Sequence, residues 1–322
     1  MNMEQEKIKE IEELYKKIKE TRLPPDLTEK ATLMIQRAES ALRFSGRSES
    51  LDLVENYVSW ITSLPWYTVT RDRLELEEAK EILDENHYGL EKLKERIIEY
   101  LAVMKLKRQQ NGENGVQKFM RAPVLCFVGL VGTGKTTIAY SIAKAINREF
   151  VRIPFGGMGS ALDLRGQSRQ HAETEPGYVI KALKRAGTKN CVMLLDEIDR
   201  VAENARTDIM GILVELLDPE QNMAYIDHYI DFPFDLSQVL FIATANNTKN
   251  ISTAVMDRLE PLQMPSYTDE QKIAIGRDYV FPKVIQESGI KPNQLIIDEN
   301  IWPHIVRPLG YDAGIRTLER TI

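Results

Sequence analysis

Hydrophobic positions at the start of the chain recur at helical spacing. In residues 4–20, Ile8, Ile11, Tyr15 and Ile18 follow one another at intervals of three and four among many Glu and Lys residues. This spacing predicts an amphipathic helix, but it lasts for about two heptads and a coiled coil needs three to four. A solvated helix and a short arm that packs on a partner both fit the pattern.

Further helical patterns fill the region up to residue 110. A Pro-Pro pair ends the first helix, and Asp26 or Thr28 is a candidate N-cap for the second. Later helices are expected over residues 51–64 and over residues 77–109, with an interruption at His87-Tyr-Gly89. The polar, glycine-containing residues 109–121 predict a linker.

After the linker, short apolar runs alternate with segments of helix length. The runs cover residues 124–128, 150–153, 192–195 and 239–244, and a helical pattern over residues 135–146 follows the first. Strands that alternate with helices form a parallel sheet covered on both faces. We therefore expect an α/β fold with a doubly wound parallel sheet.

The last part of the chain predicts a small helical domain. Its helices are expected over residues 269–288 and 298–307, with a weak strand pattern at 295–297 and a hinge at Pro261 and Pro265. The expected organisation is a helical N-terminal arm over residues 1–70, an α/β domain over 71–266, and a helical lid over 267–322.

Composition and charge exclude several classes of protein. Of the 322 residues, 43% are hydrophobic and 28% are charged, which excludes wholesale disorder. A net charge of −6 argues against DNA and anionic lipid as partners, and we expect Lys144, Arg148 and Arg152 to form only a solvated basic face. The apolar runs are far shorter than the roughly 18 residues of a membrane helix, so no membrane association is expected.

The two cysteines and the first residues bear on location. Cys126 and Cys191 both lie inside apolar runs, which predicts buried thiols in a reducing compartment. The acidic start of the chain lacks the apolar segment of a signal peptide. A cytoplasmic protein is expected.

The strongest chemical signal is a glycine-rich motif between a predicted strand and a predicted helix. Gly129-Leu-Val-Gly-Thr-Gly-Lys-Thr136 matches G-x-x-x-x-G-K-T, whose backbone N–H groups cradle phosphates and whose lysine neutralises them. The motif predicts an ATP site with Mg²⁺ as cofactor. The expected binding residues are Gly129, Gly132, Thr133, Gly134, Lys135, Thr136 and Thr137.

Two later strands end in polar residues that fit the same site. Asp196 ends the third apolar run and is expected to hold Mg²⁺ together with Thr136, while the next residue, Glu197, is placed to polarise an attacking water. Asn246 follows the fourth run and is expected to orient that water. Ligands bind at the carboxyl edge of a parallel sheet, so the three motifs predict one hydrolytic site.

This order of motifs resembles that of AAA+ ATPases, and longer strings narrow the resemblance to the ATPase region of the Lon family of ATP-dependent proteases. The strings run in family order over nearly the whole chain: Ser63-Leu-Pro-Trp66, His87-Tyr-Gly-Leu-Glu-Lys-Leu-Lys-Glu-Arg96, Leu217-Asp-Pro-Glu-Gln-Asn222, Asp227-His-Tyr-Ile230, Phe241-Ile-Ala-Thr-Ala-Asn-Asn247 and Ala313-Gly-Ile-Arg-Thr-Leu-Glu-Arg320. The resemblance implies an AAA+ P-loop NTPase fold with a preceding all-helical segment and a following lid.

The resemblance also implies roles for two arginines that the residues alone would leave as ordinary surface arginines. Arg258 matches the family's arginine finger, which reaches the nucleotide of a neighbouring subunit, and Arg316 matches sensor 2 in the lid. An arginine supplied in trans needs an oligomer. The family implies a homo-hexamer that acts on unfolded or damaged protein.

The chain departs from the family pattern in several places. The string of the Ser–Lys protease dyad does not occur, the family's large N-terminal domain is missing, and the lid is expected to be truncated. Proteolysis would therefore need a separate or downstream Ser–Lys domain. In the loop that the family uses to grip polypeptide, aligned on Arg169, His171-Ala-Glu173 replaces an aromatic–aliphatic–glycine triplet, and Asn204-Ala-Arg-Thr-Asp208 differs in a second loop.

Together these features predict a Lon-like ATPase. We expect ATP hydrolysis in a ring that unfolds and translocates polypeptide for serine-type proteolysis. Two alternatives stay open: a remodelling chaperone without a proteolytic role, and a nucleotide-binding module that co-assembles with an intact Lon-type protease.

Overall fold

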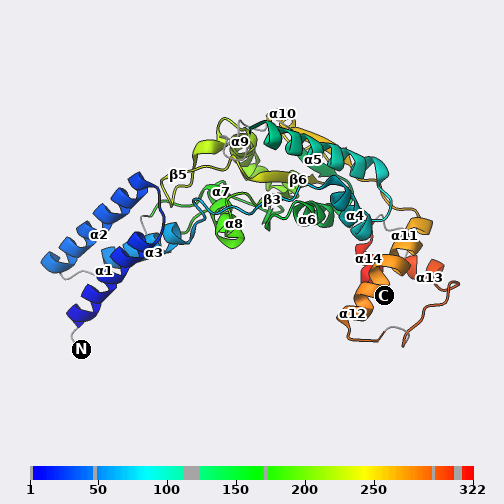
Figure 1. Cartoon of the computed structure of the whole chain (residues 1–322), viewed down its shortest axis with the longest axis horizontal. Helices are drawn as coiled ribbons and strands as arrows, with labels where there is room; N and C mark the ends of the chain where they lie inside the picture. The colour runs from blue at the N-terminus through cyan, green and yellow to red at the C-terminus, as the bar shows by residue number, and fades with distance from the viewer. Residues whose placement is uncertain (1–2, 46–48, 112–122, 170–172, 292–293, 308–313) are drawn as a thin grey trace.

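The chain folds into three parts that follow one another along its longest axis (Figure 1). The computed structural model describes residues 3–45, 49–111, 123–169, 173–291, 294–307 and 314–322. The N-terminal arm lies at one end, the α/β domain in the middle, and the lid with the C-terminus at the other end. No helix among the described residues has the length and apolar character needed to cross a membrane.

The arm is built from three helices, as expected. They are α1 (Met3–Glu20), α2 (Pro25–Ser45) and α3 (Glu49–Ser63), and their apolar faces form a common core. The expectation that Asp26 or Thr28 caps α2 is wrong, because the helix already begins at Pro25. The fixed φ of proline suits the first helical position, so Asp26 and Thr28 both lie inside the helix.

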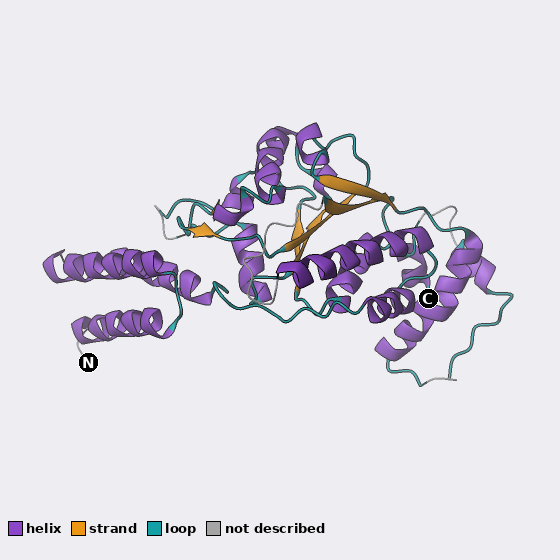
Figure 2. Cartoon of the chain, turned by 45° about the horizontal axis from the view of Figure 1, so that its top comes forward, coloured by secondary structure: helices purple, strands orange, loops and turns teal. Residues whose placement is uncertain are grey.

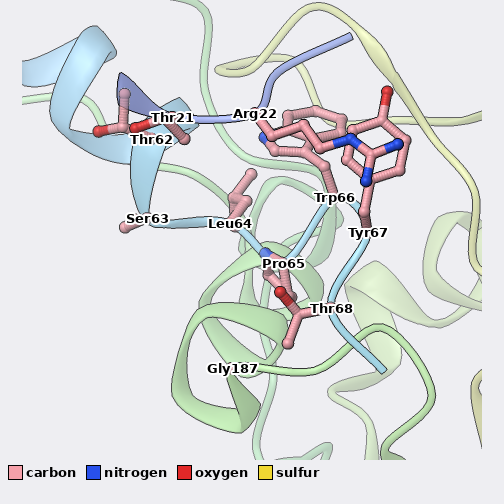
Figure 3. Close-up of a pocket in the computed structure, with 10 residues that line it drawn as sticks. All are labelled: Thr21, Arg22, Thr62, Ser63, Leu64, Pro65, Trp66, Tyr67, Thr68 and Gly187. Carbon is pink, nitrogen blue, oxygen red and sulfur yellow. The ribbon is translucent and has the colours of Figure 1, made fainter. Parts of the chain in front are cut away.

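The arm joins the α/β domain through an aromatic contact, and a pocket lies beside that contact. The Trp66 ring lies 5.9 Å from the Phe232 ring and 4.9 Å from the Phe234 ring, which makes the arm core continuous with the core of the α/β domain. Beside this contact is a pocket of about 450 Å³ (Figure 3). In the pocket wall, the Arg22 guanidinium lies 4.5 Å from the centroid of the Tyr67 ring.

The helical region after the arm confirms the interruption at His87. It also extends into the first residues of the expected linker. It consists of α4 (Leu76–Asn86) and α5 (Glu91–Asn111). Residues 109–111 of the expected linker therefore belong to a helix. The remaining linker residues, 112–121, lie outside the described residues.

The five-stranded sheet is parallel, with the order β2-β3-β6-β1-β7. The strands are β1 (Val124–Val128), β2 (Phe150–Pro154), β3 (Val192–Asp196), β6 (Leu240–Ala245) and β7 (Leu259–Gln263). The first four confirm the expected runs. Strand β7 was not expected, and the hinge expected at Pro261 is wrong, because Pro261 lies inside this edge strand, where a sheet tolerates proline. A short hairpin of β4 (Tyr225–Ile226) and β5 (Pro233–Phe234) was also not expected.

Helices cover both faces of this sheet (Figure 2). Successive side chains of a strand point to opposite faces, so each strand contributes to two cores. One core joins Met193 and Phe241 to α8 (Tyr178–Ala186) and α9 (Arg206–Leu217). The other joins Leu194 and Ile242 to α4, α5 and α6 (Lys135–Ala145). The expected doubly wound α/β fold is confirmed, and both cysteine thiols are buried and unpaired.

The lid is helical, with boundaries that differ from the expected ones. Its elements are α11 (Asp269–Ile275), a π-helical turn (Gly276–Val280), α12 (Phe281–Glu287), α13 (Trp302–Val306) and α14 (Arg316–Thr321). The first three form one helical stretch, as expected for residues 269–288. The strand pattern at residues 295–297 is wrong, because this segment is an irregular loop.

The expectation of a solvated basic face holds for Lys144 and is wrong for Arg148. The Arg148 guanidinium forms two hydrogen bonds of 2.8 Å to the Asp72 carboxylate. The exposed fractions of the two side chains are 5% and 8%. This buried pair fixes the segment before α4 against the start of β2.

Breaking this pair should destabilise the α/β domain. In Arg148→Met, the Asp72 carboxylate stays buried without its main partner, so the free energy of unfolding should fall by about 3–5 kcal/mol. Urea denaturation measures the change. The control is Lys16→Met, which removes an ion pair whose side chains are 71% and 65% exposed and should change the free energy by less than about 0.5 kcal/mol. Equal losses in the two variants would contradict the assignment.

Candidate nucleotide-binding site

Three adjacent strands bring the predicted motifs together. Strands β3, β6 and β1 are neighbours in the sheet and run in the same direction, so their carboxyl ends lie at one edge. Asp196 ends β3, Asn246 follows β6, and the glycine-rich loop follows β1. The structure thus places the three predicted groups side by side.

The glycine-rich loop needs its glycines. Gly132 and Gly134 have φ values of +82° and +92°, in the left-handed region that favours glycine. A Cβ atom on Gly129 would lie 2.5 Å from the Met264 carbonyl oxygen. Within the loop, the buried Thr133 donates its hydroxyl to Leu130 O at 2.9 Å.

The loop leads directly into α6, and three predicted residues open that helix. Lys135 is its first residue, Thr136 is half-buried, and Thr137 is exposed and donates its hydroxyl to Gly134 O at 2.8 Å. The N-terminal end of an 11-residue helix carries backbone N–H groups and a positive dipole end. Both favour an anion in front of the loop.

The Lys135 amine is bound by oxygen atoms of the site itself. It donates to Gly129 O at 2.6 Å, to Leu130 O at 2.8 Å and to Asn246 Oδ1 at 3.1 Å. The Nδ2 atom of Asn246 is buried and has no hydrogen-bond partner among the described residues. A buried donor without a partner is costly, so this amide fits a ligand that brings an acceptor oxygen.

Asp196 is held by two residues that the motif analysis missed. Its Oδ1 accepts a hydrogen bond from Thr244 Oγ1 at 2.5 Å, and its Oδ2 accepts one from Arg152 Nε at 2.6 Å. Arg152 is exposed, as expected, although its guanidinium pairs with this carboxylate. Thr244 could have been found from the sequence, because a hydroxyl in the middle of an apolar strand must have a partner.

Glu197 has an unusual backbone conformation. Its φ is +57°, which is uncommon for a residue other than glycine, and its N–H donates to Thr244 Oγ1 at 2.8 Å. Its carboxylate passes over Gly156, where an added Cβ would lie 2.9 Å from Glu197 Oε2. Conformations of this kind occur where the surroundings hold a functional side chain in place.

Asp199 is a third residue that the motif analysis missed. It binds the side-chain amide of Asn247 but not that of Asn246. Its carboxylate accepts hydrogen bonds from Asn246 N at 3.0 Å, Asn247 N at 3.2 Å and Asn247 Nδ2 at 3.3 Å. The amide of Asn247 is thus used to fix the turn. The amide of Asn246 instead accepts a hydrogen bond from Lys135.

The donor set suits Mg²⁺ better than a metal held by protein alone. Among the described residues, no group of three or more His, Cys, Asp or Glu side chains is arranged to bind a metal. Mg²⁺ is usually held by one or two protein oxygens together with phosphates and water. The Asp196 carboxylate and the Thr136 hydroxyl fit that pattern.

The lid packs directly on the glycine-rich loop. Ile315 N donates to Gly132 O at 2.9 Å, and a Cβ atom on Gly314 would lie 2.5 Å from Val131 O. From the segment that leads into α11, Tyr267 donates its hydroxyl to Thr133 O at 3.3 Å. Arg316 is the first residue of α14, so the structure brings this predicted residue next to the loop.

Arg258 lies at the amino-terminal ends of the strands, opposite to the glycine-rich loop at their carboxyl ends. It precedes β7, whose first residue, Leu259, pairs with Val124, the first residue of β1. The glycine-rich loop follows the last residue of β1, so a whole strand length of roughly 13 Å separates the two positions. Arg258 instead pairs with Asp218 at 2.8 Å, and this contact lowers the pKa of Asp218. The structure does not bring Arg258 into the site of its own chain.

The two departures in the expected polypeptide-gripping loops are only partly visible. His171 and Ala172 lie outside the described residues, while Glu173 is exposed. Residues 204–208 belong to a short 3₁₀ turn (Glu203–Ala205) and to the start of α9.

His87 flanks the first turns of α6. Its Nε2 lies 3.0 Å from Ser141 Oγ, and the ring is buried. Burial, together with the positive charge of Lys94, lowers the pKa of His87 to about 4, while a backbone hydrogen bond with Thr137 acts in the opposite direction. The centroid of the neighbouring Tyr88 ring lies 6.3 Å from that of the Tyr279 ring of the lid. The segment of His87 and Tyr88 therefore lies between α6 and the lid.

The fold and site define an ATPase domain of the AAA family. Residues 125–266 match the family described as "ATPase family associated with various cellular activities (AAA)". Lon protease 2 of Thermus thermophilus is 42% identical over 315 residues, which are 97% of this chain and 39% of that protein. The Lon protease of Heliobacterium modesticaldum is 43% identical over 311 residues, 97% of this chain and 37% of its own length. This chain is a Lon-type ATPase region and spans about two fifths of the relatives it matches.

The contact between the lid and the loop can be tested by adding one methyl group. Gly314→Ala would place a Cβ atom against Val131 O and push the lid away from the loop, so it should weaken nucleotide binding by about tenfold. Fluorescent-nucleotide titration measures this. In the control, Gly211→Ala, the added Cβ meets no described atom within 4 Å, and binding should not change. Unchanged binding in Gly314→Ala would contradict the contact.

The buried His87 ring predicts a pH dependence of stability. Its pKa of about 4 in the folded protein is below the ordinary value of 6.5, so protons bind first to the unfolded chain as pH falls. The stability that neutral His87 provides should therefore be lost between about pH 6.5 and pH 4, by at most about 3 kcal/mol.

Urea denaturation of the wild type and His87→Asn at several pH values checks this loss. The difference in unfolding free energy between them should shrink toward pH 4. The exposed His228, replaced in the same way, serves as the control. A difference that does not vary with pH would overturn the prediction.

Proposed function

We propose that this chain is the motor of a Lon-type protease: it hydrolyses ATP with Mg²⁺ and uses the energy to unfold and translocate polypeptide. The observation that carries the proposal is the meeting of the glycine-rich loop, the Asp196–Glu197 pair and Asn246 at three adjacent strand ends. The hydrogen bond from Ile315 N to Gly132 O supports the proposal, because it would put the lid next to a nucleotide bound at the loop.

The phosphates of ATP would be held by residues of the loop and by the start of α6. Lys135 already lies among carbonyl oxygens of the loop, and its ammonium would move from these oxygens to the β- and γ-phosphates. The unpaired Nδ2 of Asn246 would donate to the γ-phosphate or to the water beside it. Gly129, Gly132, Thr133, Gly134 and Thr137 complete this binding set.

Thr136 and Asp196 would hold Mg²⁺. When bound, the ion neutralises phosphate charge and orients the phosphates for reaction. The hydrogen bond from Thr244 to Asp196 keeps the carboxylate oriented. Arg152, which also contacts Asp196, is 53% exposed and has room to move aside.

Glu197 would act on the attacking water. Its carboxylate can accept a proton from the water and so raise its reactivity. Its backbone is fixed by Thr244, and Gly156 leaves the space through which the side chain passes. Asn246 would hold the same water in line with the γ-phosphate.

Arg258 and Arg316 would stabilise the charge of the transferring phosphoryl group from two different places. Arg316 would act from the lid of the same chain, and Arg258 from a neighbouring subunit, since it lies at the far edge of its own sheet. A closed ring supplies every site with such a neighbour, and we propose a homo-hexamer.

The substrate and the source of proteolysis are proposed from the names of the relatives. Those named above are called Lon proteases, so we propose unfolded or damaged protein as the substrate and a separate or downstream Ser–Lys domain as the source of proteolysis. A cytoplasmic location is proposed because both thiols are buried and unpaired, which suits a reducing compartment. No specific observation favours the remodelling chaperone or the co-assembling module.

Replacing the proposed base separates binding from hydrolysis. Glu197→Gln should bind ATP as the wild type does and lower the hydrolysis rate by about 10²–10⁴-fold, because the amide cannot accept the proton of water. Phosphate release measures the rate. The matched control is the exposed Glu203→Gln, which should hydrolyse ATP normally.

Mixing two inactive variants tests the proposed arginine finger. Arg258→Ala alone should lose about 10³–10⁵-fold in rate. A mixture with Glu197→Gln should recover part of the activity, because Glu197→Gln subunits supply Arg258 to sites with an intact Glu197. A mixture as inactive as its components would rule out action in trans.

A further inference from the structure

The loop between α7 (Leu162–Arg165) and α8 has a closely packed base. At its end, Gly177 N donates to Asp227 Oδ2 at 2.7 Å. Asp227 is completely buried, and its other oxygen accepts two N–H groups of its own turn. A Cβ atom on Gly177 would lie 1.9 Å from Leu164 O. The two ends of the loop are thus held against the turn that carries Asp227.

Arg169, inside this loop, points to the N-terminal arm. Its guanidinium lies 4.1 Å from the centroid of the Tyr57 ring on α3 and 6.0 Å from that of Tyr229. It donates to Tyr229 O and lies 3.7 Å from Asp231 Oδ2. The Tyr57 hydroxyl donates to Ile230 O at 3.1 Å. One side chain of the loop therefore contacts both the arm and the turn after β4.

A second arm helix reaches the same place. Lys30 of α2 donates to Asp231 Oδ2 at 2.6 Å and also to the Asp231 carbonyl oxygen. Asp231 has a φ of +49°, in the left-handed region that aspartate adopts more readily than most residues other than glycine. We refer to Lys30, Tyr57, Arg169, Tyr229 and Asp231 as the arm joint.

The other arginine at the base of the loop bonds within the α/β domain. Arg165 pairs with Glu215 of α9, and its guanidinium lies 5.8 Å from the Tyr225 ring centroid. The loop is thus anchored on one side by Arg165 to the sheet domain and on the other by Arg169 to the arm. The two arginines form a natural pair of variants for comparison.

We propose that Arg169 is a positioning residue that fastens the described ends of this loop, residues 166–169 and 173–177, to the N-terminal arm, so that the arm sets where the loop meets polypeptide. The side chain is 17% exposed and its cation lies over an aromatic ring, where loss of water strengthens a cation–π contact. The part that concerns polypeptide rests on the proposed function. The attachment of the loop to the arm does not.

Hydrogen exchange measured by mass spectrometry on the 322-residue protein tests the attachment. In Arg169→Gln, amides of α3 and of residues 173–178 should both exchange at least about tenfold faster, because the joint opens on both sides. Arg169→Lys keeps the charge next to Asp231 and should give an intermediate rate. Arg165→Gln should change the loop and leave α3 as in the wild type.

Kinetics of ATP hydrolysis test the positioning role. With casein as the unfolded polypeptide, Arg169→Gln should raise the casein concentration needed for half-maximal stimulation several-fold. The basal kcat and the KM for ATP should stay unchanged, and Arg169→Lys should restore part of the loss. A merely structural defect would lower the basal kcat as well.

The outcomes separate the two proposals. If α3 exchanges at the wild-type rate in Arg169→Gln, the loop is not fastened to the arm and the inference is overturned. If α3 exchange rises but the casein dependence is unchanged, Arg169 has no positioning role. If casein fails to stimulate even the wild type, the proposed motor function fails while the exchange result still decides the attachment.

Discussion

The Asp196 side chain is 5% exposed, and a negative charge at such a depth is tolerated only when neighbouring groups compensate it. Thr244 on β6 and Arg152 on β2 supply that compensation, so one charge links three strands at their carboxyl ends. Thr244 also holds the backbone of Glu197. The acidic pair is therefore in place only in the observed register, because a slip of one residue would turn Thr244 to the other face of the sheet.

Features encoded by local spacing could be predicted from the sequence. The glycine-rich loop, the strand ending at Asp196 and the helices of the arm depend on neighbours within one turn or one strand. The pairs of Arg148 with Asp72 and of Arg152 with Asp196 join residues 76 and 44 positions apart, and no local pattern reveals such pairs. Strand β7 was hidden by Pro261. The use of the Asn247 amide, rather than that of Asn246, to bind Asp199 depends on how the turn folds, and no local pattern shows it.

The two domains that flank the sheet are attached in physically different ways. The lid meets the glycine-rich loop backbone to backbone, at Gly132 and Gly314, where an added methyl group has no room. The arm meets the 166–177 loop through long side chains, which can adjust their rotamers while keeping contact. The first attachment would transmit small displacements of the glycine-rich loop to the lid, because close-packed backbone cannot absorb them. The second can absorb small displacements of the loop through changes of side-chain rotamer.

The contact between Trp66 and the hairpin carrying Phe232 and Phe234 also has a consequence for synthesis of the chain. The arm leaves the ribosome before the α/β domain, and the residues that cover its base come much later, as the 173-residue separation of Tyr57 and Ile230 illustrates. At the usual speed of translation this interval lasts roughly ten to thirty seconds. During that time, the apolar base of the arm is exposed to other nascent chains and to chaperones. A protein proposed to act on unfolded polypeptides is thus itself incompletely folded during its synthesis.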